Sequence, residues 1–342
     1  MAHYSRCKNC GGEQTFKPEK GVLVCERCGG SAPVKEGSGG VIKRMYSPTY
    51  SPSDNLHTSV KYRCATCGTS SVVGTDGEVK RCSSCGNTSL TKETSKTHTP
   101  DGIIPFEIAR DKAAEIFRKW VGSRKFAPSD LKEMAKLQKI SGLYTPIWNF
   151  SFNSTMRYTC VGVRVRVDSK GQAETNEYPL DKMKDTAYSN VIISGSSRIS
   201  DTCIEGLGEY DFIKLRPYST DYLLGFAGID TDVDVHNEYN KMTNEISKDN
   251  ERKAKNKLDD SYDRVESFLC RTRFRDVVFN YAYVPIWANH YTYNGKEYHC
   301  YINGQTGKAT GSAPKSAGKI AGLVFGILAA IAAVALIIVK VL

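Results

Sequence analysis

A cysteine pattern that occurs twice constrains this chain more than any other feature of its sequence. In each copy two Cys-x-x-Cys pairs are separated by fourteen residues, and a glycine follows the second cysteine of every pair. The eight cysteines are Cys7, Cys10, Cys25, Cys28, Cys64, Cys67, Cys82 and Cys85. Two thiolates two residues apart can bind one metal ion from a tight turn, and the glycine suits a turn with positive φ. The pattern therefore predicts two small, mainly β zinc ribbons, each holding one Zn²⁺.

The metal in such a quartet has a structural role. Catalytic zinc keeps one coordination position open for water, and four thiolates leave none. Disulfide bonds, or thiols with this spacing by chance, are the alternative interpretations, and the composite spacing favours metal over both. Thiolates must stay reduced to bind metal, and the chain starts without the apolar core of a secretion signal. We therefore expect the ribbons in a reducing compartment.

The C-terminal end carries a second strong signal. Ile320–Val339 has no charged or polar side chain and is bracketed by Lys319 and Lys340. About 20 apolar residues match a bilayer core of about 30 Å, whereas a buried core helix normally keeps a polar stripe. The run predicts a single-pass transmembrane helix that enters the lipid bilayer as a tail anchor. Lys308 and Lys315, with Lys319, precede it and place the N-terminal bulk in the cytoplasm.

Small residues recur at every fourth position along this run. Gly318, Gly322 and Gly326 would lie on one helical face, which lets two helices approach closely. A homodimer through this face is one interpretation. The other is that small residues are simply frequent in membrane helices.

Composition and spacing divide the rest of the chain into segments. A chain of 342 residues exceeds the usual size of one domain. We expect ribbon 1 in 1–36, a flexible linker rich in Gly, Ser and Pro in 37–60, ribbon 2 in 61–92 and an α+β domain in 100–312. Residues 1–99 contain fourteen Lys and Arg against eight Asp and Glu, which is +6 of the chain's net charge of +10. This excess is compatible with nucleic acid or another anionic surface.

The α+β domain combines helical and strand periodicities. Residues 106–120 and 129–140 space their apolar side chains as helices do, and residues 148–160 alternate apolar and polar side chains as in a strand with one buried face. Tyr144-Thr-Pro-Ile-Trp148 returns as Tyr283-Val-Pro-Ile-Trp287, which predicts two related β units in one core. The sheet is expected to be mostly antiparallel.

Motifs for catalysis are scarce. The run Gly304-Gln-Thr-Gly307-Lys308 lacks both the spacing and the hydroxyl of a phosphate-binding loop, so helicase or ATPase activity is unsupported. His290, His299 and Cys300 share a predicted hairpin and are the only candidate centre for an enzyme, as a small metal or nucleophile site. Ordinary strand residues are the simpler interpretation, because neither a third ligand nor an orienting acid is visible.

The whole chain resembles a group of uncharacterised bacterial proteins with N-terminal zinc ribbons of the transcription-factor-IIB type. The residues that carry the resemblance are the Cys-x-x-Cys-Gly knuckles, Ile104-Pro-Phe106, Trp120, Ala127-Pro128, Pro146-Ile-Trp148, Pro217-Tyr218, Tyr222-Leu-Leu-Gly-Phe226 and Asn303-Gly-Gln-Thr-Gly307. Members are sometimes labelled as the primosomal replication-restart helicase, with which the missing phosphate-binding loop disagrees. The resemblance implies the architecture of ribbons, middle domain and C-terminal transmembrane helix, and no established activity.

Three functional hypotheses follow from the sequence. The first is a tail-anchored cytoplasmic adaptor or scaffold whose zinc ribbons bind a protein or nucleic-acid partner at the membrane. The second is a membrane-tethered DNA- or RNA-binding protein, which the positive ribbon half favours. The third is an enzyme with its site in residues 100–312.

Overall fold

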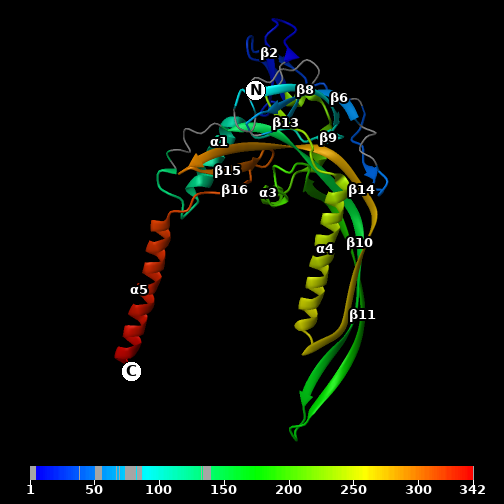
Figure 1. Cartoon of the computed structure of the whole chain (residues 1–342), viewed down its shortest axis with the longest axis vertical. Helices are drawn as coiled ribbons and strands as arrows, with labels where there is room; N and C mark the ends of the chain where they lie inside the picture. Colours follow the sequence, from blue (N-terminus) through cyan, green and yellow to red (C-terminus); the bar gives the residue numbers. More distant parts are fainter. Residues whose placement is uncertain are drawn as a thin grey trace.

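The computed structural model describes residues 5–37, 39–50, 56–66, 68, 70–73, 82, 87–131, 133 and 140–341. Within these residues the protein is mostly β (Figure 1). A small four-stranded antiparallel sheet holds the first cysteine quartet, and a 12-stranded sheet forms the body. The strands of the small sheet are β1 (Ser5–Arg6), β2 (Glu13–Lys17), β3 (Val22–Cys25) and β4 (Ser31–Ala32).

The body sheet follows the order β12-β9-β14-β10-β13-β7-β6-β8, with β11 on β10, β5 and β15 on β14, and β16 on β15. Its strands are β5 (Arg44–Met45), β6 (Leu56–Cys64), β7 (Ser70–Val73), β8 (Leu90–His98), β9 (Gly102–Ile103), β10 (Ser141–Val167), β11 (Ala173–Ser194), β12 (Arg216–Pro217), β13 (Ala227–Ile229), β14 (Arg264–Tyr293), β15 (Lys296–Asn303) and β16 (Ala309–Gly311). The helices are α1 (Arg110–Gly122), α3 (Asp201–Gly206), η2 (Phe212–Lys214), η3 (Thr220–Leu223), α4 (Val235–Asp259) and α5 (Ala317–Val341).

The two repeated Tyr-x-Pro-Ile-Trp motifs lie side by side on the central strands β10 and β14. Tyr144 pairs with Pro285 and Pro146 pairs with Tyr283, so the pairing is symmetric about Thr145 and its partner on β14. Each motif also has a short parallel neighbour at its tyrosine: β13 beside β10, and β9 beside β14. The pairing therefore has the form of an approximate two-fold relation between two strands 139 positions apart in the chain.

The same relation extends to the backbone beside each proline. The amide of Gly195 donates to the carbonyl oxygen of Pro146, and the amide of Gly304 donates to that of Pro285, both at 2.8 Å. Proline cannot donate to a sheet ladder, but its carbonyl oxygen still accepts. Each proline carbonyl thus binds the first residue after the neighbouring strand: Gly195 follows β11, which pairs with β10, and Gly304 follows β15, which pairs with β14.

The main core packs aromatic rings on these two strands. Phe106, Tyr144, Phe226 and Trp287 are buried and in mutual ring contact, with Phe106 and Phe226 stacked at 4.2 Å. Helix α1 covers part of the core because Ala113, Phe117, Trp120 and Val121 face inward from it. The predicted helix over 106–120 thus begins four residues later than expected. Most of the second predicted helix, 129–140, lies outside the described residues.

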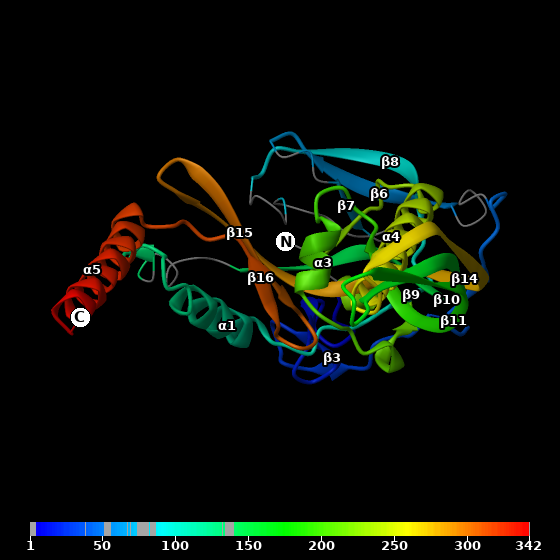
Figure 2. The same ribbon diagram turned by 90° about the horizontal axis from the view of Figure 1, so that it is seen from below.

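An arm extends from the body where β10, β11 and β14 run together (Figure 1). Helix α4 lies along one face of this arm, and Figure 2 shows it beside the three strands from a second direction. Ala254 and Leu258 of α4 form a cluster with Tyr158 and Cys160 of β10, and Asn250 donates a hydrogen bond to Thr272 of β14. Among the described residues, no helix covers the opposite face of the arm.

The described part of the segment 37–60 packs on the body. β5 pairs with β14 opposite Val278 and Phe279. The Tyr46 ring stacks on Tyr239 at 3.9 Å, and its hydroxyl lies 3.0 Å from Nδ1 of His236. These contacts hold residues 44–46 between the arm helix and the sheet.

The prediction of a transmembrane helix is wrong. Within the described part of the chain, no helix has the length and apolar character that crossing a membrane requires. Helix α5 does form over the expected run Ile320–Val339.

Two further expectations change with this finding. The single-pass localisation, with the N-terminal bulk in the cytoplasm, depended on the helix and is overturned with it. The fold is a mostly β protein with a large sheet and four α-helices among the described residues, in place of an α+β domain with a membrane span.

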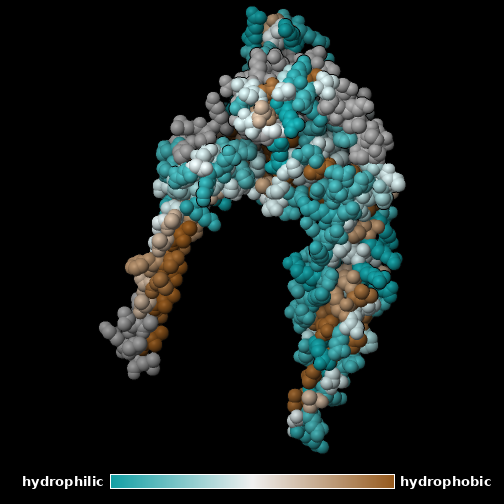
Figure 3. All heavy atoms as spheres, viewed as in Figure 1, coloured by the Kyte–Doolittle hydropathy of each residue, from teal (hydrophilic) through white to brown (hydrophobic). Residues whose placement is uncertain are grey.

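Helix α5 is held at its start, where the Lys319 ammonium donates a hydrogen bond to the carbonyl oxygen of Ala127. Beyond this point the large apolar side chains that the structure describes in α5 are exposed (Figure 3).

Candidate metal centre

Two matching turns position the first cysteine quartet. The amide of Cys7 donates to the carbonyl oxygen of Gly12, and the amide of Cys25 donates in the same way to Gly30. Gly11 and Gly29, one residue after each pair, have φ values of 68° and 70°. Glycine adopts this left-handed conformation without steric cost, which explains why a glycine follows each Cys-x-x-Cys pair.

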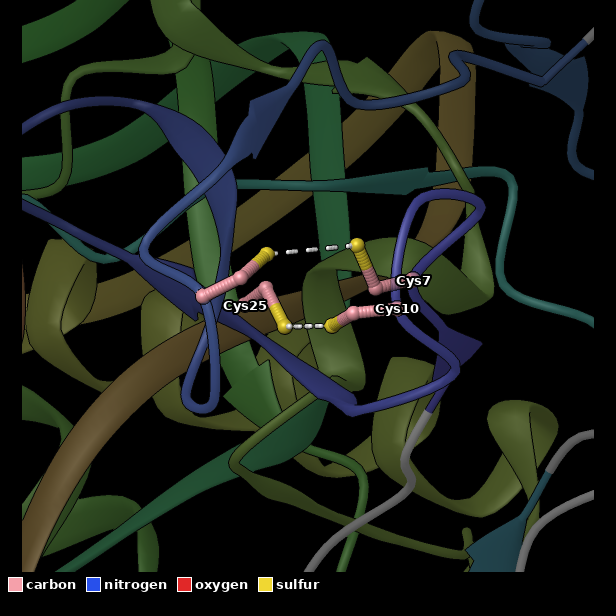
Figure 4. A group of neighbouring side chains, drawn as sticks. Cys7, Cys10 and Cys25 are labelled. Atoms are coloured by element: carbon pink, nitrogen blue, oxygen red, sulfur yellow. Dashed lines mark hydrogen bonds between the residues drawn. The ribbon is translucent and has the colours of Figure 1, made fainter.

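The turns bring four sulfur atoms together. Cys7 Sγ lies 3.8 Å from Cys28 Sγ, and Cys10 Sγ lies 3.5 Å from Cys25 Sγ (Figure 4). All four Sγ atoms lie within 4.8 Å of one another. In a tetrahedral zinc site with Zn–S bonds of about 2.3 Å, neighbouring sulfurs are about 3.8 Å apart. The quartet can therefore hold a metal ion with little movement.

The thiols of this quartet differ in acidity. Hydrogen bonds from the backbone amides of Cys28 and Arg27 help to lower the pKa of Cys25 to about 6. The Gly12 amide acts in the same direction on Cys10, but hydrogen bonding with the thiols of Cys28 and Cys25 raises the pKa of Cys10 to about 12. Metal binding needs the deprotonated thiolate, so a bound cation would favour loss of the Cys10 proton.

The small sheet is attached to the body through β2. The amide of Phe16 donates to the carbonyl oxygen of Leu224 at 2.7 Å, and the Phe16 ring packs edge-on against Tyr222 at 5.3 Å. Phe16 and Leu23 belong to the main core. The sheet is at one extreme of the molecule, with its other side away from the body (Figure 1).

The second quartet is described only in part. Cys64 and Cys82 are buried, and Cys67 and Cys85 lie outside the described residues. The described backbone has the same hydrogen bonds as the turns of the first quartet. The Gly68 amide donates to the carbonyl oxygen of Cys64, and the Cys82 amide donates to the carbonyl oxygen of Asn87. One four-cysteine group is thus brought together within the described residues, and a second metal site stays a prediction.

The candidate enzyme residues are divided between two faces of a hairpin. His290 and His299 are directly opposite each other on β14 and β15. Cys300 points to the other face, is fully buried in the main core, and has its pKa raised to about 12 by burial. His290 has a lowered pKa, because its ring is partly desolvated although the residue as a whole is exposed, and because the charge of His299 opposes protonation.

A different cysteine joins the histidines. Cys203 of α3 has its Sγ 4.0 Å from Nε2 of His299. Sequence reasoning missed it because the two residues are 96 positions apart and no motif connects them.

These observations define a mostly β protein with a group of four cysteines, attached to its body, that could hold a metal ion. The chain is 25% identical to the "Uncharacterized protein YdjG" of Bacillus subtilis (strain 168) over 314 residues. This aligned region covers 89% of the present chain and 88% of the Bacillus protein. No family model and no solved structure matches the chain.

Proposed function

We propose that this protein is an adaptor whose first ribbon binds Zn²⁺ and presents a rigid surface to a macromolecular partner. The four converging thiols of Cys7, Cys10, Cys25 and Cys28 carry this proposal. Four protein ligands leave no position for water or substrate, so the ion stabilises the ribbon instead of performing chemistry. The attachment through Phe16 supports a fixed orientation for the free side of the ribbon.

The test compares the intact protein with a ribbon variant. Cys7→Ser combined with Cys10→Ser removes two ligands, and Cys270→Ser serves as a control because Cys270 packs against α4 in the arm. We expect the ribbon variant to lose one zinc per chain and to lose crosslinked partners that the wild type and the control retain. Equal zinc content, or identical partners in all three proteins, would refute the proposal.

Nucleic acid is the partner that a second observation favours. Arg271, Arg273 and Arg275 occupy alternate positions of β14 and are exposed on the arm face opposite α4. Arg157 of β10 lies directly opposite Arg271. Alternate strand residues are about 6.6 Å apart and point to one side, so these side chains form a row that suits successive phosphates.

Among the described residues, two of these arginines, Arg271 and Arg273, have no acidic partner that neutralises their charge. Arg157 pairs with Asp181 at 2.5 Å, and Arg275 lies 3.5 Å from Asp185. Among the described residues, Arg271 and Arg273 make no ion pair. The central pair of the row is therefore available to a polyanion.

Fluorescence anisotropy with single-stranded DNA and RNA over a range of salt tests this second function. Arg271→Glu with Arg273→Glu is expected to weaken binding by at least about 10-fold and to flatten the salt dependence by about two phosphate contacts. Arg252→Glu with Lys253→Glu, the same charge change on exposed positions of α4, is the matched control. Equal losses in both variants, or no binding by the wild type at low salt, would exclude the arginine row as the interface.

A further inference from the structure

We propose that Cys203, His290 and His299 form a metal site separate from the cysteine quartets, which takes a divalent transition metal of the zinc class. The observation behind it is the meeting of an α3 thiol with a pair of histidines that face each other on two strands. This site goes beyond the proposed adaptor function, which does not use these residues.

The hairpin turn fixes the histidine pair. β14 and β15 are joined by Asn294 and Gly295, which both have positive φ, at 49° and 74°. Such a two-residue turn sets the strand register, and the register places His290 opposite His299. Side chains directly opposite in an antiparallel pair have Cβ atoms about 5 Å apart, so two imidazoles can reach one ion.

The position of α3 brings the thiol to this pair. Gly206, at the end of α3, lies so close to β16 that a Cβ there would be 2.4 Å from Oγ1 of Thr310. Figure 2 shows α3 beside β16. At the other end of the helix, the Ser200 hydroxyl accepts a hydrogen bond from the amide of Cys203. Cys203 is therefore held near the face that carries both histidines.

The distance between Cys203 and His299 suits a borderline-soft metal after a small adjustment. In a tetrahedral zinc site a thiolate sulfur and an imidazole nitrogen are about 3.6 Å apart, and here Cys203 Sγ and His299 Nε2 are 4.0 Å apart. Among the described residues the first quartet is the one group whose ligand atoms already lie together. The His290 ring, which is exposed, must therefore turn toward the other two ligands to complete the site. One thiolate and two imidazoles match Zn²⁺, Co²⁺ or Ni²⁺ rather than Mg²⁺ or Ca²⁺.

Three protein ligands leave a coordination position open. This distinguishes the site from the closed four-thiolate quartet, because the exposed side of His290 gives water or a small anion access to the ion. The Tyr301 ring lies against both histidines, with centroid distances of 5.7 Å to His290 and 5.2 Å to His299. It limits the orientations that the two imidazoles can take.

Cobalt binding to the full-length protein tests the site. The protein is first loaded with Zn²⁺ and dialysed against a weak chelator, which leaves Zn²⁺ only in the four-cysteine quartets. After removal of the chelator, Co²⁺ is titrated while visible and near-ultraviolet absorption are recorded. We expect d–d bands together with a thiolate-to-cobalt charge-transfer band. Cys203→Ser should abolish the charge-transfer band, and His290→Ala with His299→Ala should weaken Co²⁺ binding by more than about 100-fold.

Two control variants separate this site from the ribbon. Cys300→Ser changes the neighbouring residue on the opposite face and should leave the cobalt spectrum unchanged. Cys7→Ser with Cys10→Ser tests the ribbon and should also keep the spectrum. Absence of a cobalt spectrum in the wild type, or a spectrum that persists in both Cys203→Ser and the double histidine variant, would overturn the proposal whatever the fate of the adaptor function.

Discussion

The backbone amide of Phe16 donates a hydrogen bond to the carbonyl oxygen of Leu224 at 2.7 Å, which joins the ribbon to the body beside η3. The Phe16 ring is 3% exposed and contacts Tyr222 and Phe226. Through Phe226 these contacts reach Phe106 and Trp287 in the main core. The sheet that holds the first cysteine quartet is therefore coupled by packing to the central strands.

Phe16→Ala tests this coupling. Removing a buried phenylalanine side chain typically costs about 3 to 5 kcal/mol, because burial is lost and a cavity is left. We expect a loss of that size in the free energy that holds the ribbon on the body. Hydrogen exchange measures it as faster exchange of the β2 and β3 amides relative to those of β10 and β14.

Ile213→Ala is the control for this variant, because Ile213 is 90% exposed. A change at such a surface position is expected to stay within about 0.5 kcal/mol. If Phe16→Ala exchanged no faster than this control, the ring contacts would not be what holds the ribbon.

The number of zinc ions per chain shows whether one or both cysteine quartets bind metal. We predict that the wild type retains two zinc ions per chain after dialysis against a weak chelator, which empties any site with only three protein ligands. Cys7→Ser with Cys10→Ser should leave one ion, and Cys64→Ser should also leave one. A Cys64→Ser protein that still carried two ions in native mass spectrometry would remove the second quartet from consideration.

The convergence of the four sulfur atoms of the first quartet could be predicted from the local spacing of the cysteines. Each Cys-x-x-Cys-Gly turn is closed by hydrogen bonds within six residues, so its geometry depends little on the rest of the chain. The alternation over 148–160 was similarly informative, because the side-chain period of a strand is local; β10 covers all of it. Local patterns therefore found the turns and the long strand.

Contacts between distant residues could not be read in this way. Cys203 meets His299 across 96 positions and Phe16 meets Leu224 across 208, and neither contact leaves a periodic signal. Cys300 was grouped with the histidines because it is adjacent in sequence, although successive strand residues point to opposite faces. For the run Ile320–Val339, apolar composition predicted a membrane span that the described helix does not support.

Gly304→Ala is predicted to destabilise the body. A Cβ at this position would lie 2.5 Å from Cδ1 of Phe106 and 2.8 Å from Cβ of Pro285, in a tightly packed part of the core. Overpacking of this kind typically costs about 1 to 3 kcal/mol. Gly122→Ala is the matched control: it lies at the end of α1 with nothing within 4 Å of the new methyl group. It should be neutral or stabilise slightly, since alanine favours the helix.

Urea unfolding of the two glycine variants gives the comparison directly. The expected result is a lower midpoint for Gly304→Ala alone, with an unchanged slope. Equal midpoints would mean that Phe106 and Pro285 move apart at no cost, and that the close approach of the turn to the core is unimportant for stability.

Asp101 is predicted to be the strongest polar link between the segment 44–46 and the body. Its side chain is 3% exposed; it forms an ion pair with Arg44 and accepts a hydrogen bond from the amide of Tyr281 at 2.9 Å. Asp101→Ala removes the carboxylate and leaves that buried amide without this acceptor, so we expect a loss of about 3 to 5 kcal/mol. Asp101→Asn keeps an oxygen for the Tyr281 amide but loses the charge, and should cost less.

The exposed ion pair between Lys214 and Glu107 provides the comparison, with side chains 49% and 39% exposed. Because water and salt screen such a pair, Glu107→Ala is expected to cost at most about 1 kcal/mol, and less at high ionic strength. Unfolding measured at low and high salt should therefore give a large, salt-insensitive loss for Asp101→Ala and a small, salt-sensitive one for Glu107→Ala. Similar losses in the two variants would mean that water reaches Asp101, and that the segment 44–46 is held by Tyr46 and its ring contacts instead.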